Sequence, residues 1–291
     1  MRRDAWALCL RRWSFVHRNA NDSPAAELDE PTRQFYWKAL DILDGNRIRY
    51  CVAGAYALAA HAGIVRHTKD LDVFLCRDDL QRAIDVLERA GYATERTHPH
   101  WLAKVFGTED HDGREGAGAF IDLIFRAASG IWTVDEEWVS HAQPGDVVGR
   151  TAPICPGEEL IWSKAMVMER NRFDGADIAH TLLARGRTLD WDRLLRRARG
   201  HAGVLLGHLV FFRYVYPNPD DARNVPDAVL DELLRRMRSE PPPSERVCRG
   251  TLLSWEHYLI DVNERGFVDG RLQPWGTLTQ AEIDRWTEAP K

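Results

Sequence analysis

The chain has few cysteines and no long apolar run. Its five cysteines are scattered through 291 residues without a Cys-x-x-Cys pair, which argues against a zinc site and against a disulfide framework. The longest apolar stretch, residues 203–216, is interrupted by His208 and Arg213 and falls short of the roughly 18 apolar residues that cross a membrane. We therefore expect no membrane partner and a reducing, cytoplasmic location.

An excess of basic charge is also lacking. The net charge of −5 at pH 7 gives no general attraction to phosphate, so a general nucleic-acid binder is not indicated. Local basic patches remain open as an alternative. The arginine-rich segment 185–199 is either a solvated helix face or a contact for an acidic or nucleic-acid substrate.

The first 30 residues are expected to form a leader. They begin with basic residues, but the apolar stretch that follows has only about six residues, short of the roughly 7 to 15 of a signal peptide. The whole chain has 44% hydrophobic residues, enough for a sizeable core in one large or two modest domains.

Two carboxylates, Asp70 and Asp72, are the most informative feature of the sequence. They lie in the segment 68–75, where charged and apolar residues alternate as in a short strand. Residues i and i+2 of a strand point to the same side, so the two carboxylates could bind one or two divalent cations. The alternative is that they form an ordinary solvated strand end.

Gly54 and Ala55 lie between an apolar strand and an alanine-rich helix. A strand that enters a helix through glycine leaves backbone N–H groups free at the helix N-terminus, where they suit a phosphate. An ordinary, tightly packed turn is the alternative.

A third carboxylate, Asp122, lies in the middle of the apolar strand 119–125. Because a buried, unpaired carboxylate is costly, we expect either a metal ion or an arginine such as Arg66 or Arg126 beside it.

Together these segments resemble the nucleotidyltransferase superfamily of the polymerase-beta type, closest to its small bacterial AbiEii- and MenT-like branches. The resemblance covers roughly residues 45–180. It implies that Asp70, Asp72 and Asp122 are catalytic and bind two Mg²⁺ ions. Ala55 stands where the family has a second glycine or serine, which keeps the backbone N–H but removes a hydroxyl. The implied nucleotide-binding residues are Gly54, Ala55, Arg66, Thr68, Lys69 and Lys164.

Lys164 is singled out by its place in a helix predicted over residues 158–172. It shares the apolar stripe of Leu160 and Met168, so its ammonium group needs a cavity or an anion. With Asp174 and Asp177 it also resembles the Lys and Asp-x-x-Asp arrangement of AbiEii-like proteins. We expect Lys164 to reach the nucleotide phosphates; a solvated helix lysine is the alternative.

The predicted fold is α/β (α+β), with a small mixed-sheet nucleotidyltransferase domain followed by a helical region. We expect a leader at 1–30, the sheet domain at 31–150 and the helical domain at 151–291, joined by a connector at 144–156. The other predicted elements are a helix at 34–43, strands at 48–53 and 103–106, a helix at 80–90, a loop at 108–118, a helix buried all round at 204–216 and a helix at 251–262.

The predicted function is Mg²⁺-dependent transfer of a nucleoside monophosphate from a nucleoside triphosphate to a hydroxyl group. The sequence leaves the acceptor open among tRNA, a protein and a small molecule. The alternative is a non-catalytic nucleotide-binding module or a component of a toxin–antitoxin pair. His61, His67 and His100 are candidate proton carriers, although surface or core histidines are common.

Overall fold

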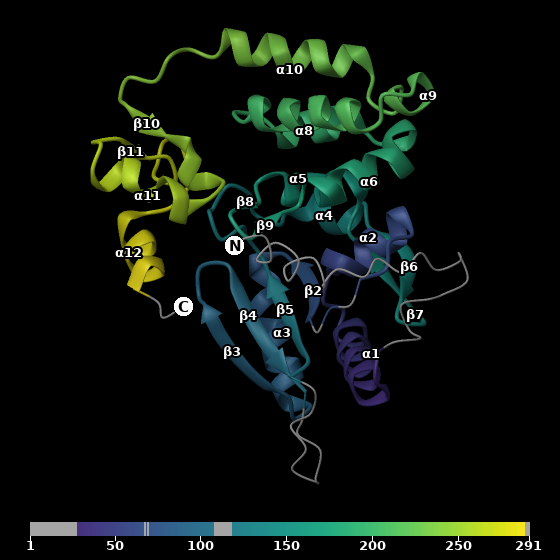
Figure 1. The fold of residues 1–291 in the computed structure, drawn as a ribbon. Coiled ribbons are helices and arrows are strands. Elements are labelled where there is room, and N and C mark those ends of the chain that lie inside the picture. The colour runs from purple at the N-terminus through teal and green to yellow at the C-terminus, as the bar shows by residue number, and fades with distance from the viewer. Residues whose placement is uncertain (1–27, 67, 69, 108–117, 289–291) are drawn as a thin grey trace, which may run out of the picture.

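The computed structural model describes residues 28–66, 68, 70–107 and 118–288. A mixed β-sheet with its helices forms the lower part of the molecule in Figure 1, and a mainly helical region lies above it. This confirms the expected α/β sheet domain with a following helical region. The predicted leader, apart from residues 28–30, and the predicted loop, apart from residue 118, lie outside the described residues. Within those residues, no helix is long and apolar enough to cross a membrane.

The main sheet has seven strands in the order β3-β4-β5-β2-β1-β7-β6. The pairs β2–β5 and β1–β7 are parallel, and the other neighbours are antiparallel. The strands are β1 (Tyr50–Val52), β2 (Asp70–Leu75), β3 (Ala93–His98), β4 (Leu102–Phe106), β5 (Phe120–Ile124), β6 (Gln143–Val147) and β7 (Arg150–Ile154).

The side chains of strand β2 alternate between an apolar face and an acidic face of the sheet. Leu71, Val73 and Leu75 have no exposed surface and belong to the main hydrophobic core. Because side chains alternate along a strand, Asp70 and Asp72 point to the opposite face, where they are half-buried. The core also takes in the apolar faces of the sheet-domain helices α1 (Glu30–Gly45), α2 (Gly54–Ala62) and α3 (Arg77–Arg89).

The region after the sheet contains helices and two short strand pairs. Its helices are α5 (Gly157–Ala165), α6 (Gly175–Arg185), α7 (Trp191–Arg197), α8 (Ala202–Val215), α9 (Pro219–Ala222), α10 (Asp227–Ser239), α11 (Trp255–Asn263) and α12 (Gln280–Glu288), after α4 (Glu136–Ser140) in the sheet domain. The antiparallel hairpin consists of β8 (Met168–Glu169) and β9 (Arg172–Phe173), and the parallel pair consists of β10 (Val247–Cys248) and β11 (Val268–Asp269). The turns 186–188 and 249–252 are 3₁₀-helical.

Three local predictions were wrong. The predicted connector 144–156 is mostly the β6–β7 hairpin. Proline is tolerated in this hairpin because Pro144 lies on the edge strand β6 and because β7 pairs with β1 at one residue pair only. Few backbone hydrogen bonds of the sheet are therefore lost. The helix predicted over 158–172 ends at Ala165, and a two-residue turn with Asn171 joins β8 to β9. Helix α8 is buried on one side only, since Val210 is 54% exposed and Tyr214 82%.

Strand β3 was not predicted because its residues are polar. It is an edge strand whose side chains are mostly exposed or half-buried, so it lacks the alternation of apolar residues that marked β2 and β5. The division of the chain into domains at residues 150 and 151 stays a prediction; in the structure these residues begin β7.

A buried ion-pair cluster joins α5 to α7. The guanidinium of Arg193 contacts the carboxylates of Glu158 and Glu159, and all three side chains are at most 7% exposed. Arg197 adds a second contact to Glu159 at 3.2 Å and also binds Asp135. These two arginines of the arginine-rich segment are therefore bound internally rather than facing a substrate.

Arg193→Met should lower the free energy of unfolding by about 3–5 kcal/mol, because it leaves the buried carboxylate of Glu158 without its cation and that of Glu159 with Arg197 alone. Denaturant unfolding followed by circular dichroism measures the change. Arg223→Ala is the control, since the Arg223–Asp220 pair is 70% and 77% exposed and should matter little. Equal effects of the two variants would contradict a structural role for the buried cluster.

Candidate active site

The register between β2 and β5 brings two of the predicted site residues together. Asp72 lies directly opposite Asp122 in these adjacent parallel strands, whose spacing is about 4.8 Å. Asp70, two residues before Asp72, lies opposite Phe120 and points to the same face. Three carboxylates from two neighbouring strands therefore share one face of the sheet.

The backbone of Gly54 lies directly against the carboxylate of Asp72. Its φ of +57° is a left-handed conformation that favours glycine, and a Cβ atom at this position would lie 1.8 Å from Oδ2 of Asp72. The backbone N–H of Ala53 also donates to the carbonyl oxygen of Asp72 at 2.8 Å. Helix α2 begins at Gly54 without a side-chain cap, so no capping side chain occupies the N–H groups of its first turn.

The surroundings of Asp72 disfavour the ionised form of its carboxyl. Burial, followed by the negative charges of Asp70 and Asp122, raises the pKa of Asp72 to about 7. Arg172 and then Lys164 act in the opposite direction without cancelling this rise. A divalent cation between these carboxylates would relieve the same repulsion.

Asp122 carries its own counter-charge. The ammonium of Lys104, on the neighbouring strand β4, lies 2.8 Å from Oδ1 of Asp122 and 3.5 Å from the ring centroid of Phe120. Burial raises the pKa of Asp122, while the hydrogen bond and charge of Lys104 lower it. The sequence suggested Arg66 or Arg126 as the alternative partner, but Arg66 pairs with Asp177 and Arg126 pairs with Glu282.

The segment that leads into β2 serves the site indirectly. The hydroxyl of Thr68 donates to the carboxylate of Asp70, and the N–H of Asp70 donates back to this hydroxyl at 3.3 Å. The guanidinium of Arg66 is paired with Asp177 on α6. Lys69 and His67 lie outside the described residues. Contacts of Arg66 and Thr68 with a nucleotide stay predictions.

Lys164 is buried and held by two carboxylates. Its ammonium lies 3.1 Å from Asp174 and 2.8 Å from Asp177, and its side chain is 10% exposed. It is close enough to Asp72 to lower the pKa of that carboxyl. Lys164 is therefore not a solvated helix lysine, and its contact with nucleotide phosphates stays a prediction.

Four residues around the carboxylates were missed by the sequence analysis. They are Lys104, Arg172 and two buried tyrosines, Tyr36 of α1 and Tyr56 of α2. Burial and the nearby negative charges of Asp70 and Asp72 raise the pKa of both tyrosines, and the two rings meet edge-on at 6.3 Å. Only Tyr56 had a usable signal, since it follows Gly54 by two residues.

The candidate proton carriers lie away from the carboxylates. The Nε2 atom of His61 is 2.7 Å from the carbonyl oxygen of Cys155, and burial lowers its pKa. Burial and the neighbouring His98 lower the pKa of His100 to about 4. Neither histidine is among the groups that shift the pKa of Asp72.

The described residues contain no ready-made metal cluster. No group of three or more histidine, cysteine, aspartate or glutamate side chains among them is arranged to hold a metal ion. The donors themselves fit a divalent cation at Asp70 and Asp72, because both are carboxylates and Asp72 lacks full charge compensation. Asp122 fits less simply, because Lys104 already binds its Oδ1 atom.

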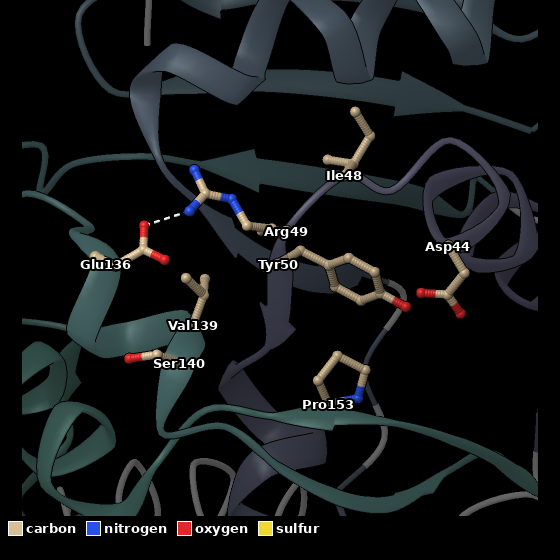
Figure 2. A pocket seen from close by; sticks show the side chains of 8 residues that line it. All are labelled: Asp44, Ile48, Arg49, Tyr50, Glu136, Val139, Ser140 and Pro153. Carbon is tan, nitrogen blue, oxygen red and sulfur yellow. Dashed lines mark hydrogen bonds and ion pairs between the residues drawn. The ribbon is translucent and has the colours of Figure 1, made fainter.

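A pocket of about 240 Å³ lies at the other end of β1, lined by residues including Asp44, Arg49, Tyr50 and Glu136 (Figure 2). Tyr50 pairs with Leu75, five residues along β2 from Asp70, or about 17 Å. The charged side chains that line this pocket already have partners, since Arg49 binds Glu136 and Asp79, and Asp44 binds Arg150. This pocket is therefore separate from the acidic face.

Residues 54–202, just over half of the chain, match a family described as "Uncharacterised nucleotidyltransferase" (NTP_transf_5). The chain belongs to this family. The match begins at Gly54 and includes all three carboxylates and the Lys164 network. It confirms the expected nucleotidyltransferase relationship; the AbiEii- and MenT-like branches stay a resemblance. No curated protein matches the chain.

Several solved structures have a similar fold at low identity. The antibiotic-resistance factor ANT(2'')-Ia is 17% identical, with a TM-score of 0.41 over 62% of this chain and 98% of its own. The lincosamide antibiotic adenylyltransferase LnuA is 15% identical, with a TM-score of 0.36 over 51% and 94%. JHP933 from Helicobacter pylori is 13% identical, with a TM-score of 0.37 over 73% and 97%.

Gly54→Ala should disrupt the site as well as the turn. The new methyl group would displace the carboxylate of Asp72 and also strain the backbone, so we expect a lower melting temperature and loss of Mg²⁺-dependent nucleotide binding. Thermal melting and calorimetric titration with nucleoside triphosphates measure the two effects.

Gly63→Ala is the matched control for this substitution. Gly63 ends the same helix with a φ of +69°, but nothing lies within 4 Å of a Cβ atom there. It carries the backbone strain without the clash, so it should lower the melting temperature and leave nucleotide binding intact. If both variants bind nucleotide like the wild type, the contact between Gly54 and Asp72 has no role in the site.

Proposed function

We propose that the protein transfers a nucleoside monophosphate from a nucleoside triphosphate to a hydroxyl acceptor. The observation that carries this proposal is the register of Asp72 opposite Asp122, with Asp70 on the same face and the Gly54 turn against Asp72. Membership in a nucleotidyltransferase family supports it. The family itself does not specify the acceptor.

Asp70 and Asp72 would hold divalent metal ions, two Mg²⁺ in the full site, with Asp122 as the third carboxylate. Such ions supply Lewis acidity and neutralise phosphate charge during phosphoryl transfer. The N–H groups at the start of α2, beginning at Gly54 and Ala55, would bind the phosphates. Thr68 orients the carboxylate of Asp70 by its hydrogen bond. Arg66, Lys69 and Lys164 remain proposed nucleotide contacts.

The transfer step exchanges one phosphorus–oxygen bond for another. The acceptor oxygen forms a bond to the α-phosphorus, and the bond from this phosphorus to the bridging oxygen breaks. Pyrophosphate leaves with the electron pair, and the hydroxyl proton passes to solvent. Positive groups around the phosphates lower the barrier by stabilising the developing charge.

The acceptor is proposed to be an RNA such as tRNA, a protein or a small molecule. Two of the structural neighbours are named for antibiotics as acceptors or ligands, which keeps a small molecule among the candidates without favouring it. A cytoplasmic location and a toxin–antitoxin partner are proposed on the resemblance and the composition alone.

One observation favours a non-catalytic nucleotide-binding module as a second candidate. Lys104 occupies Oδ1 of Asp122, so the third carboxylate is already neutralised before any cation binds. In such a module the phosphates would bind at the Gly54 turn, and the acidic face would not support transfer.

Two measurements on the full chain separate these functions. A thermal shift with each common nucleoside triphosphate, with and without Mg²⁺, detects binding, and a ligand at about 100 times its dissociation constant adds about 2.7 kcal/mol. Mass spectrometry of candidate acceptors then detects an added nucleotide. Metal-dependent binding with a modified acceptor supports the enzyme, binding without transfer supports the module, and no binding contradicts both.

Asp72→Asn should abolish transfer and stabilise the unliganded protein at pH 8. The raised pKa of about 7 means that the neutral carboxyl stabilises the fold fully below about pH 4. This stability is lost as the pH rises through 7, because the ionised form is repelled by its neighbours. The neutral amide keeps it, so the melting temperature of the variant should exceed that of the wild type at pH 8 and match it near pH 4. Activity close to wild type would remove Asp72 from the mechanism.

A further inference from the structure

The hairpin of β8 and β9 is anchored to the helical region at both strands. The N–H of Met168 donates to the carbonyl oxygen of Leu253 at 3.2 Å, and the hydroxyl of Ser254 donates to Glu169. On β9, the ring of Phe173 stacks on His208 with centroids 5.9 Å apart. The hairpin therefore has a fixed position beside α8 and α11.

Gly175 lets the Phe173 ring lie against the start of α6. A Cβ atom at Gly175 would lie 2.2 Å from Cζ of Phe173, so only glycine leaves room for the ring. Since neighbouring residues of a strand point in opposite directions, the side chain before Phe173 is directed away from α8. That side chain is Arg172.

Arg172 is a cation with unused hydrogen-bond capacity beside the acidic face. Its side chain is 67% exposed, and its hydrogen bonds within the described part of the chain are two long ones to Asp174, of 3.3 and 3.4 Å. A guanidinium has five N–H donors in a planar fork that matches phosphate oxygens. Arg172 and Lys164 both contact Oδ2 of Asp174, and Lys164 also pairs with Asp177, the partner of Arg66 on the segment that enters β2. In keeping with this placement, Arg172 has the largest effect among the cations that lower the pKa of Asp72.

Lys164, the cation expected from the sequence, is less available. Its ammonium is surrounded by Asp174 and Asp177 and is 10% exposed, so two carboxylates already neutralise it. To bind a phosphate it would have to give up at least one of its contacts of 3.1 and 2.8 Å to these buried carboxylates, which is costly. Arg172 would give up only its two long bonds, of 3.3 and 3.4 Å, and Asp174 would keep its contact with Lys164.

We propose that Arg172 binds the leaving-group phosphates of the nucleoside triphosphate, with the β8–β9 hairpin holding it over the acidic face. This assignment rests on the proposed function. The triphosphate would then lie between two phosphate-binding elements, the start of α2 on the sheet side and Arg172 on the helical side, with Asp72 close to both. Arg172 contributes where negative charge accumulates as pyrophosphate departs.

The test is equilibrium binding of the full chain to each common nucleoside triphosphate and its monophosphate in the presence of Mg²⁺, measured by calorimetry. Arg172→Gln should weaken triphosphate binding about ten- to a hundredfold, the range of a lost charge-assisted contact. Monophosphate binding should change little, because the β- and γ-phosphates are missing. Arg172→Lys should fall between, since it keeps the charge and loses the fork.

Arg170→Gln is the matched control. Arg170 is an exposed arginine in the turn of the same hairpin, so its removal changes the net charge equally and should leave triphosphate binding unchanged. Unaltered melting temperatures of the variants show that the hairpin is folded. Equal triphosphate affinity of Arg172→Gln and the wild type, or an equal loss in Arg170→Gln, overturns the assignment while the proposed function stands. Failure of the wild type to bind any triphosphate overturns the proposed function, and this assignment with it.

Discussion

The parallel pairing of β2 with β5 is the constraint on which the acidic face depends. Side chains alternate between the faces of a strand, so a slip of one residue would send Asp72 or Asp122 into the core and an apolar residue to the open face. Leu71, Val73 and Leu123 are fully buried on the core side and thereby lock this register. Hydrophobic packing on one face thus fixes the position of carboxylates on the other.

The fixed register brings like charges together, and the surrounding elements compensate for them only in part. Lys104 on β4 neutralises Asp122, while Arg172 on the hairpin and Lys164 on α5 act on Asp72 from farther away. The raised pKa of Asp72 shows that compensation is incomplete. A folded protein keeps such an uncompensated acidic group mainly where a bound cation or ligand completes the charge balance.

The residues of the acidic face could be predicted because their signals are local. Asp70 and Asp72 alternate with buried residues, Gly54 separates a strand from a helix, and Asp122 interrupts an apolar strand. The order of the central elements followed from the same periodicities. Metal ligation and nucleotide contacts stay predictions.

What escaped prediction depends on contacts between distant segments. Lys104 is a site residue only because β4 pairs with β5 in the register that places it opposite Asp122, and the edge strand β3 has no apolar alternation. Helical spacing that continues through Met168 predicts a long helix that includes Arg172, whereas in the structure the chain turns at Asn171 between β8 and β9. Local sequence patterns predict which face of the sheet a side chain occupies, but only the register between strands determines which residue of the neighbouring strand lies beside it.

The ion pairs between the two parts of the chain argue that the site is largely assembled before a substrate binds. Asp177 on α6 accepts contacts from Lys164 of the helical region and from Arg66, which precedes β2. The Asp177 side chain is 3% exposed, so separating the two parts would leave a buried carboxylate without one of its partners. Such pairs contribute little net stability compared with apolar packing, yet breaking one is costly, so they favour a single arrangement. Because Arg66 lies on the segment that carries Thr68 to Asp70, the same contact that docks the helical region also positions the entry to the acidic strand.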